Sequence, residues 1–304
     1  RVTLFDIDGD YVVDSHITIV RPNKEKVLPK YALYALATIG FKTIESMANG
    51  QSGQIELPLS TIEGIKIPVP PIVIQDGVNK QIANIEKTET LNRQTIENAQ
   101  VELYNIINSN RSAEYLFLDE SLVVVNEATI NPNLFPNNSF IYVDIDSVEN
   151  GTGVVSFSKK ILGETAPSRA RRIAKSGSTI ISTVRPNLKG FGYISEEIED
   201  CIYSTGFAVF RSVSENKMLN KWLYFNFMYS DDLMQQIISA MPKGQYPSIN
   251  STDIRSFRVH VPTLEVQKEI IEQAENLEQK IISAREALKQ AEKVKRQIFF
   301  NSLI

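Results

Sequence analysis

The segment Val261-Pro262-Thr263-Leu264-Glu265-Val266-Gln267 decides the fold of this chain, because a version of it occurs twice. The earlier version is Val69-Pro70-Pro71-Ile72-Val73-Ile74-Gln75, at an offset of 192 positions. Identical residues continue at this offset: Gln81 and Gln273, Asn84 and Asn276, Glu86 and Glu278, Ala99 and Ala291, Ile106 and Ile298. A constant offset over roughly 45 residues without a gap indicates an internal duplication, which must be recognised before any motif is interpreted.

Each copy continues into a long run that predicts an α-helix. Apolar residues of the second copy recur at alternating steps of four and three, which is typical of a heptad seam. They are Ile270, Ala274, Leu277, Ile281, Ala284, Leu288, Ala291 and Ile298. The first copy carries a similar seam, so we expect helices over Asp76–Asn108 and Val266–Phe300. Each would be about 50 Å long at 1.5 Å per residue.

Neither helix can bury its apolar stripe alone, so we expect the two to pair antiparallel. The first seam is interrupted by Glu89 and Asn92, which this pairing places near Leu288 and Ala284 as a polar layer that fixes the register. Lys295 is the one defect of the second seam. The alternative is that the helices pack separately on two globular domains, which their length disfavours.

The remaining sequence predicts two globular units of α/β (α+β) class. We assign residues 1–74 to the first unit, 75–111 to the first long helix, 112–263 to the second unit and 264–304 to the second long helix. Strands are expected over 1–22, with Asp8-Gly9 as a hairpin turn, and over 65–69, 122–125, 140–143, 153–157, 179–184 and 207–210. Helices are expected over 30–46 and 221–240. Arg1 aligns near Phe191, so about 75 residues of the first unit have no counterpart here.

Composition excludes several classes of protein. The chain has 304 residues, a net charge of −4, one cysteine and two histidines, which leaves no disulfide framework and no zinc-ligand pattern. Neither a membrane span nor a signal peptide is visible, so we expect a cytoplasmic protein. Because the first residue is Arg1, we also expect the chain to begin inside a longer polypeptide.

A search for catalytic chemistry finds no active site. The acidic run Asp6, Asp8, Asp10 has the wrong glycine position for a calcium loop. Asn131-Pro132-Asn133-Leu134 lacks the second proline and the aromatic residue of an amino-methyltransferase turn. Glu215-Asn216-Lys217 has the spacing of some nucleases without the paired carboxylate, so a loop ion pair explains it better. We therefore expect a non-catalytic chain without a cofactor or metal of its own.

Binding chemistry is concentrated in the second unit. Between Lys159 and Tyr193 there are eight basic residues and one acidic residue, a footprint typical of nucleic-acid binding. Arginine and lysine suit phosphates, while arginine and asparagine also suit guanine and adenine. The alternative, solvated loops without function, becomes less favoured because three such loops fall in one domain. The candidate DNA contacts are Arg169, Arg171, Arg172 and Lys175; Arg185, Asn187 and Lys189; Lys243, Gln245 and Tyr246; and, in the first unit, Asn49, Gln51 and Ser52.

The alternation of globular units and long helices resembles the specificity subunit of type I restriction–modification systems. The resemblance covers the whole chain and rests on Ser168-Arg169-Ala170-Arg171-Arg172, Ser182-Thr183-Val184-Arg185-Pro186-Asn187 and the twin junctions at Pro70/Gln75 and Pro262/Gln267. It implies two target-recognition domains, the first incomplete here, that read a bipartite site on double-stranded DNA and are held apart by an antiparallel coiled coil.

The resemblance also implies partners. Two methyltransferase (modification) subunits, which use S-adenosylmethionine, would dock on the helices, and a restriction (motor and nuclease) subunit could join the complex. One alternative is the specificity region of a single-chain restriction–modification enzyme, with methyltransferase and nuclease domains upstream of Arg1. Another is a coiled-coil scaffold whose globular domains bind protein.

Overall fold

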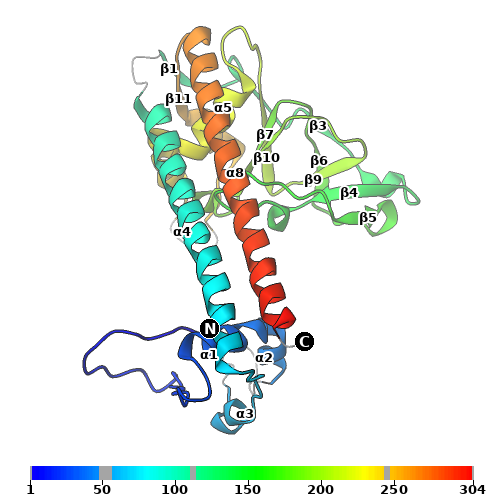
Figure 1. Cartoon of the computed structure of the whole chain (residues 1–304). Coiled ribbons are helices and arrows are strands. Elements are labelled where there is room, and N and C mark those ends of the chain that lie inside the picture. The colour runs from blue at the N-terminus through cyan, green and yellow to red at the C-terminus, as the bar shows by residue number, and fades with distance from the viewer. Residues whose placement is uncertain (1, 48–56, 110–113, 243–246, 303–304) are drawn as a thin grey trace. The chain divides into compact units, whose positions relative to one another are not determined.

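The computed structural model describes residues 2–47, 57–109, 114–242 and 247–302. The chain divides into two compact units, and each long helix contributes one end to each unit (Figure 1). Unit 1 comprises Arg1–Glu97 and Lys280–Ile304, and unit 2 comprises Asn98–Gln279.

The described part of unit 2 contains three β-sheets. The order of the four-stranded sheet is β2-β10-β7-β8, all antiparallel, and that of the five-stranded sheet is β3-β6-β9-β4-β5, parallel only between β4 and β9. A separate pair joins β1 to β11. The strands are β1 Glu114–Phe117, β2 Val123–Val125, β3 Ala128–Thr129, β4 Ser139–Val143, β5 Lys160–Leu162, β6 Ala170–Ile173, β7 Ser178–Ser182, β8 Phe191–Ile194, β9 Cys201–Ser204, β10 Phe207–Ser212 and β11 Arg258–Val261. Short 3₁₀ turns are η1 Pro132–Leu134, η2 Ile145–Ser147, η3 Gly163–Thr165 and η4 Pro186–Leu188.

The sequence located β2, β4, β7 and β10 within a few residues, but the strand expected over 153–157 is wrong. That segment makes only an isolated bridge, between Val148 and Val155. Gly153 has a φ of +77°, and a Cβ added there would lie 2.2 Å from the hydroxyl oxygen of Tyr224. A left-handed glycine pressed against an aromatic side chain cannot continue a regular strand.

Buried side chains from both larger sheets form the core of unit 2. One of its clusters includes Val143 of β4, Ile180 of β7 and Tyr203 of β9. The helix α5 (Asn220–Tyr229) adds Phe227, whose ring centroid lies 5.1 Å from that of Phe210 and 6.1 Å from that of Phe191. Burying aromatic and branched side chains in this way stabilises the fold by about 1.5–3 kcal/mol for each residue.

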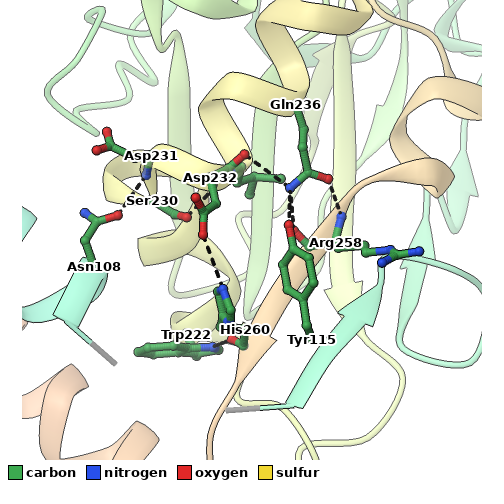
Figure 2. A network of polar contacts seen from close by, with 10 residues as sticks. Asn108, Tyr115, Trp222, Ser230, Asp231, Asp232, Gln236, Arg258 and His260 are labelled. Carbon is green, nitrogen blue, oxygen red and sulfur yellow. Dashed lines mark hydrogen bonds and ion pairs between the residues drawn. The ribbon is translucent and has the colours of Figure 1, made fainter. Parts of the chain in front are cut away.

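The helix expected over 221–240 is two helices, α5 and α6 (Asp231–Ala240). Ser230 has extended backbone between them, and its hydroxyl accepts a hydrogen bond from the Leu233 amide. A serine at this position favours a new helix start over continuation. Figure 2 shows the network beside this break, in which the amide of Asp231 donates to Asn108 Oδ1 at 2.9 Å.

The same network fastens α6 to the β1–β11 pair. Asp232 lies 3.3 Å from the Nε2 of His260, whose ring stacks on that of Tyr115 at 4.5 Å (Figure 2). Gln236 accepts from the Arg258 amide at 2.7 Å and donates to the Tyr115 hydroxyl at 3.0 Å. The helix α7 (Ser251–Ser256) precedes β11.

Unit 1 contains the helices α1 (Pro29–Thr38), α2 (Phe41–Ser46) and α3 (Leu59–Glu63). The single helix expected over 30–46 is broken at Gly40, whose φ of +81° is incompatible with a right-handed helix. In α1, Tyr31 and Tyr34 face a buried cluster that also contains Val78, Ile82 and Phe299.

The strands and the hairpin expected over residues 1–22, and the strand expected over 65–69, are wrong. These segments carry no helix or strand where they are described. At the repeat offset, residues 66–69 correspond to β11, and the counterpart of its partner β1 is missing from the sequence. Residues 9–20 correspond to β9 and β10, and their neighbours β4, β6 and β7 are missing in the same way. A strand without a neighbour has no partners for its backbone hydrogen bonds.

The long helices are α4 (Ile72–Ser109) and α8 (Leu264–Asn301), of 38 residues each. They pack together as expected, and within unit 1 they run antiparallel (Figure 1). Ile82 of α4 shares a cluster with Phe299 of α8, whereas Glu89, further along α4, meets Lys295, which comes earlier in α8. The register expected from the heptad pattern is wrong, because Glu89 meets Lys295 and not Leu288, which lies seven residues earlier in α8.

Each long helix begins at a hydrogen-bonded junction, and the two junctions have the same arrangement. A fully buried glutamine lies at the centre of each. In unit 2 the Oε1 of Gln267 accepts from the Leu219 amide at 2.8 Å, and its Nε2 donates to the carbonyls of Lys217 and Pro262 at 2.9 and 2.8 Å. In unit 1, Gln75 repeats the arrangement with the backbone of Leu28, Lys26 and Pro70, at 2.8, 2.8 and 2.7 Å. The duplication read from the sequence therefore extends to individual hydrogen bonds.

Candidate nucleic-acid interface

The first basic segment is a strand for most of its length, not the loop that we expected. Arg171 and Arg172 belong to β6, which is held between β3 and β9. The guanidinium of Arg171 donates to the Ala170 carbonyl at 2.7 Å and to Asn133 Oδ1 at 3.4 Å. Arg169 precedes the strand and is exposed. Residues 170–173 form a strand because their backbone groups pair with β3 on one side and with β9 on the other.

Lys175 of this segment is engaged in an ion pair within unit 2, and Arg172 is half-buried. Lys175 and Arg211 both bind the carboxylate of Glu127, at 2.7 and 2.8 Å, and these hydrogen bonds lower the pKa of Glu127. Burial lowers the pKa of Arg172, whose Nε has no hydrogen-bond partner among the described atoms. Lys175 follows β6, at the opposite end of the strand from Arg169.

The second basic loop connects β7 to β8 through η4. Arg185 and Lys189 flank η4 with left-handed φ values of 48° and 54°, which are uncommon for residues other than glycine. The ammonium of Lys189 donates to the Met228 carbonyl near the end of α5 at 2.7 Å, and burial lowers its pKa. A cation at a helix C-terminus is favourable, so Lys189 anchors the loop. Arg185 and Asn187 are exposed.

The structure brings these basic segments together at the turn between β9 and β10. The amide of Thr205 donates to the Arg169 carbonyl at 2.7 Å, and the Gly206 carbonyl accepts from the amide and the hydroxyl of Thr183 at 2.8 and 2.9 Å. Since β9 and β10 are interior strands of different sheets, this turn connects one sheet to the other. Thr205 is exposed at the junction. Sequence reasoning missed this turn because it carries no charge.

A further segment reaches the same place. The amide of Arg185 donates to the Pro247 carbonyl at 2.8 Å, the amide of Ile249 donates to the Thr183 carbonyl at 2.9 Å, and Val184 bridges to Ser248. Lys243, Gln245 and Tyr246, which precede Pro247, lie outside the described residues, as do Asn49, Gln51 and Ser52 of unit 1. We call the surface formed by Arg169, Thr183–Asn187, Thr205 and Pro247–Ile249 the loop cluster.

Several basic residues of the footprint already have partners within unit 2. Of the eight basic residues between Lys159 and Tyr193, Lys159 pairs with Asp144, Lys175 with Glu127, and Lys189 with a backbone carbonyl. The two exposed arginines of the segment, Arg169 and Arg185, both belong to the loop cluster. The exposed arginines of this footprint therefore lie where the basic loops meet.

The described residues show neither a cluster of metal ligands nor a membrane-spanning helix. No group of three or more histidine, cysteine, aspartate or glutamate side chains is placed there to hold a metal ion. No described helix has both the length and the apolar composition needed to span a bilayer.

Comparisons with known proteins agree with this organisation. The family model of the Type I restriction modification DNA specificity domain matches residues 3–85 and 74–293. The HindI specificity subunit of Haemophilus influenzae is 22% identical over 51% of this chain and 31% of its own length. A protein of Methanocaldococcus jannaschii named as the MjaX specificity subunit is 24% identical over 98% of this chain and 73% of its own.

A solved structure shows the same fold. The HsdS subunit from Thermoanaerobacter tengcongensis superposes with a TM-score of 0.51 and 29% identity, over 60% of this chain and 46% of that one. This chain thus spans less than half the length of that subunit and about a third of the HindI protein. Because the family model covers nearly all of the sequence, in two matches that follow the internal repeat, the chain belongs to the Type I restriction modification DNA specificity family.

Proposed function

We propose that this chain is a non-catalytic DNA-recognition subunit of a type I restriction–modification complex, and that unit 2 reads one part of the target with the loop cluster. The observation that carries the proposal is the convergence of Arg169, Arg185 and Asn187 on one surface through the Thr205–Gly206 turn. These side chains come from two segments, and each segment is hydrogen-bonded through its backbone to the Thr205–Gly206 turn.

The chemistry of the loop cluster suits a duplex. Arginine contacts phosphates and pairs with guanine, and asparagine pairs with adenine in the major groove. Arg171 and Arg172, in the strand β6 that follows Arg169, would add to the phosphate contacts. Lys175 and Lys189 would contribute through their field and by holding the loop, since each already binds a group of unit 2. Lys243, Gln245 and Tyr246, and in unit 1 Asn49, Gln51 and Ser52, remain candidate contacts.

The wider assembly follows from the family and from the helices. Helices of 38 residues are about 57 Å long, and one turn of B-DNA advances about 34–36 Å. Two recognition units joined by such helices would read two short sequences around an unread spacer. The helices would also dock methyltransferase subunits, two of them, which bring S-adenosylmethionine, and a restriction subunit would complete a cytoplasmic complex.

The experiment compares DNA binding and methylation by the complex assembled with its methyltransferase subunits. Arg169→Ala should weaken binding to all sequences and flatten its salt dependence, because a lost phosphate contact carries no base preference. Arg185→Ala or Asn187→Ala should relax the preference at one part of the target, by roughly 1–3 kcal/mol for a lost bidentate contact. Lys160→Ala, in the edge strand β5, is the matched control. Wild-type binding and an unchanged motif in the loop-cluster variants would remove this surface from recognition.

A further inference from the structure

A buried ion pair interrupts the apolar contact between the long helices. The ammonium of Lys295 lies 2.8 Å from Oε1 of Glu89 and 3.0 Å from Oε2, with 19% and 10% of the two side chains exposed. Glu292, on the same helix as Lys295, binds the ammonium at 2.7 Å. From the sequence, Glu89 and Lys295 were separate defects of two seams. In the structure the two side chains neutralise each other's charge in one ion pair.

The internal repeat shows what these positions would otherwise contain. At the offset of 192 positions, Glu89 corresponds to Ile281 and Lys295 corresponds to Leu103. Ile281 is 5% exposed and Leu103 is fully buried, so both counterparts are ordinary seam residues. The duplicated helices thus differ at the very positions where they meet through charge.

This difference makes pairing between like helices unfavourable. Two α4 helices from two copies of the chain, paired in the same way, would place Glu89 against Leu103. Two α8 helices would place Lys295 against Ile281. Either arrangement buries a charge without its partner, which costs far more than an apolar contact contributes. Only α4 with α8 brings the two charges together.

The ion pair also discriminates between registers of the correct pair. A slip of seven residues keeps an apolar heptad seam in step, so apolar spacing alone permits it. That slip would place Leu288 against Glu89 and Ile82 against Lys295, and both charges would lose their partner across the interface. The apolar pattern of the sequence predicted Leu288 as the neighbour of Glu89, which shows that the seam by itself does not determine the register.

We propose that Glu89 and Lys295 are positioning residues that select α4–α8 pairing in one register and thereby determine the spacer of the DNA target. The second part rests on the proposed function. A slip of seven residues moves one helix by about 10.5 Å along the other. At roughly 3.4 Å for each base pair, this distance corresponds to about three base pairs of spacer.

The test replaces both charges with the residues that the repeat carries at these positions. The methylated sequences of cells that express Glu89→Ile/Lys295→Leu with the methyltransferase subunits are compared with those of the wild type. We expect unchanged bases in each part of the target and more than one spacer length. Glu89→Lys/Lys295→Glu restores the attraction between the helices and should retain one spacer. Glu292→Gln, which leaves the pair between the helices intact, is the control and should also retain one spacer.

A second measurement reads the register without DNA. Cysteines at 82 and 299, which belong to one packed cluster, report the observed register, and cysteines at 82 and 292 report the slipped one. Cys201→Ala removes the native thiol from every variant. With Glu89 and Lys295 present we expect only the 82–299 disulfide, and with Ile and Leu in their places we expect both disulfides.

The two measurements separate the possible failures. If the folded Glu89→Ile/Lys295→Leu chain forms only the 82–299 disulfide and methylates with one spacer, the ion pair does not select the register and the proposal is wrong. If the wild-type complex methylates no split sequence, the proposed function is wrong, and the disulfides still decide whether the ion pair selects the register. Denaturant unfolding of each variant shows that the comparison concerns folded protein.

Discussion

At the scale of single residues, Gln75 and Gln267 show how a side chain can join a globular unit to a helix. Each glutamine is fully buried and makes three hydrogen bonds to backbone groups on both sides of a proline junction. One of these bonds is accepted from the residue that precedes α1 or α5. The start of a short helix and the start of a long helix are thereby held by one amide group.

We expect Gln267→Ala to destabilise unit 2, because one buried amide and two carbonyls would lose their partner together. Each unsatisfied buried group costs about 1–3 kcal/mol, so a loss of roughly 2–5 kcal/mol in the free energy of unfolding is expected after partial relaxation. Urea unfolding followed by circular dichroism measures this loss. Gln273→Ala, an exposed position on the same helix, is the control. Equal midpoints for the two variants would contradict the role given to Gln267.

The sequence identified both glutamines through the repeat, but not what they bind. Their partners lie up to 50 positions away in unit 2 and up to 49 in unit 1, and no local pattern announces them. The same limit applies to the binding residues. Arg169 and Arg185 were identified by residue type, whereas Thr205 was missed, because its position between two loops follows from strand pairing alone.

At the scale of elements, sequence patterns located helices and strands where local chemistry decides them. The long helices were predicted within four residues at each end because their seams have a sustained period. Ser230 and Gly40 broke two expected helices through a cap and a left-handed turn, which are single-residue effects inside a helical pattern. The prediction of strands in unit 1 was wrong for another reason. Alternation of apolar and polar residues is typical of a strand, but only a neighbouring strand stabilises it.

Contacts between elements also bear on the response to pH. In unit 2 the Tyr224 hydroxyl of α5 donates to Glu278 of α8 at 3.1 Å. Burial raises the pKa of Glu278 above its usual value, and repulsion from Glu275 adds to this, while Lys221 and the Tyr224 hydrogen bond oppose it. An acid with a raised folded-state pKa holds its proton longer when folded than when unfolded. Its contribution to stability is therefore present at low pH and lost as pH rises from the unfolded value through the folded one.

Glu278→Gln should remove this loss while keeping an acceptor for Tyr224. We expect the free energy of unfolding of the wild type, relative to the variant, to fall as pH rises from about 4.5 towards neutrality. Urea titrations at several pH values give this difference. Glu272→Gln, at an exposed position of the same helix, controls for the general effect of removing a carboxylate. A wild type that gains stability relative to the variant over this interval would refute the assignment.

At the scale of the whole molecule, the chain enters and leaves the globular part of unit 2 at the same place. Strands β1 and β11 pair antiparallel with Glu114 opposite Val261, immediately after α4 and immediately before α8. The ends of the globular part are therefore fixed to each other by the β1–β11 pair, whatever lies between them. A segment with paired ends can be exchanged without altering the path of the helices.

We expect that replacing residues 114–261 with the corresponding segment of another family member changes one part of the target only. The other part and the spacer should remain as they were, since the long helices and unit 1 are untouched. Sequencing of methylated DNA from cells that carry the chimaera measures all three features. A control chimaera cut inside the β1–β11 pair, at residues 117 and 261, should fold poorly. Concerted change of both parts of the target would show that the units do not read independently.

The glutamine junction has a consequence for how far two copies of an ancestral segment can diverge. Every partner of Gln75 and Gln267 is a main-chain amide or carbonyl, which every residue offers apart from the amide that proline lacks. Substitutions around the junction consequently change packing but leave the hydrogen bonds in place. The glutamine is the only side chain that these hydrogen bonds require at each junction. In this chain the two junctions share both their hydrogen bonds and the residue types that provide the backbone partners: Leu28 and Leu219, Lys26 and Lys217, Pro70 and Pro262. The junction has therefore stayed recognisable in both copies of the duplicated segment, even where the long helices that follow it have diverged.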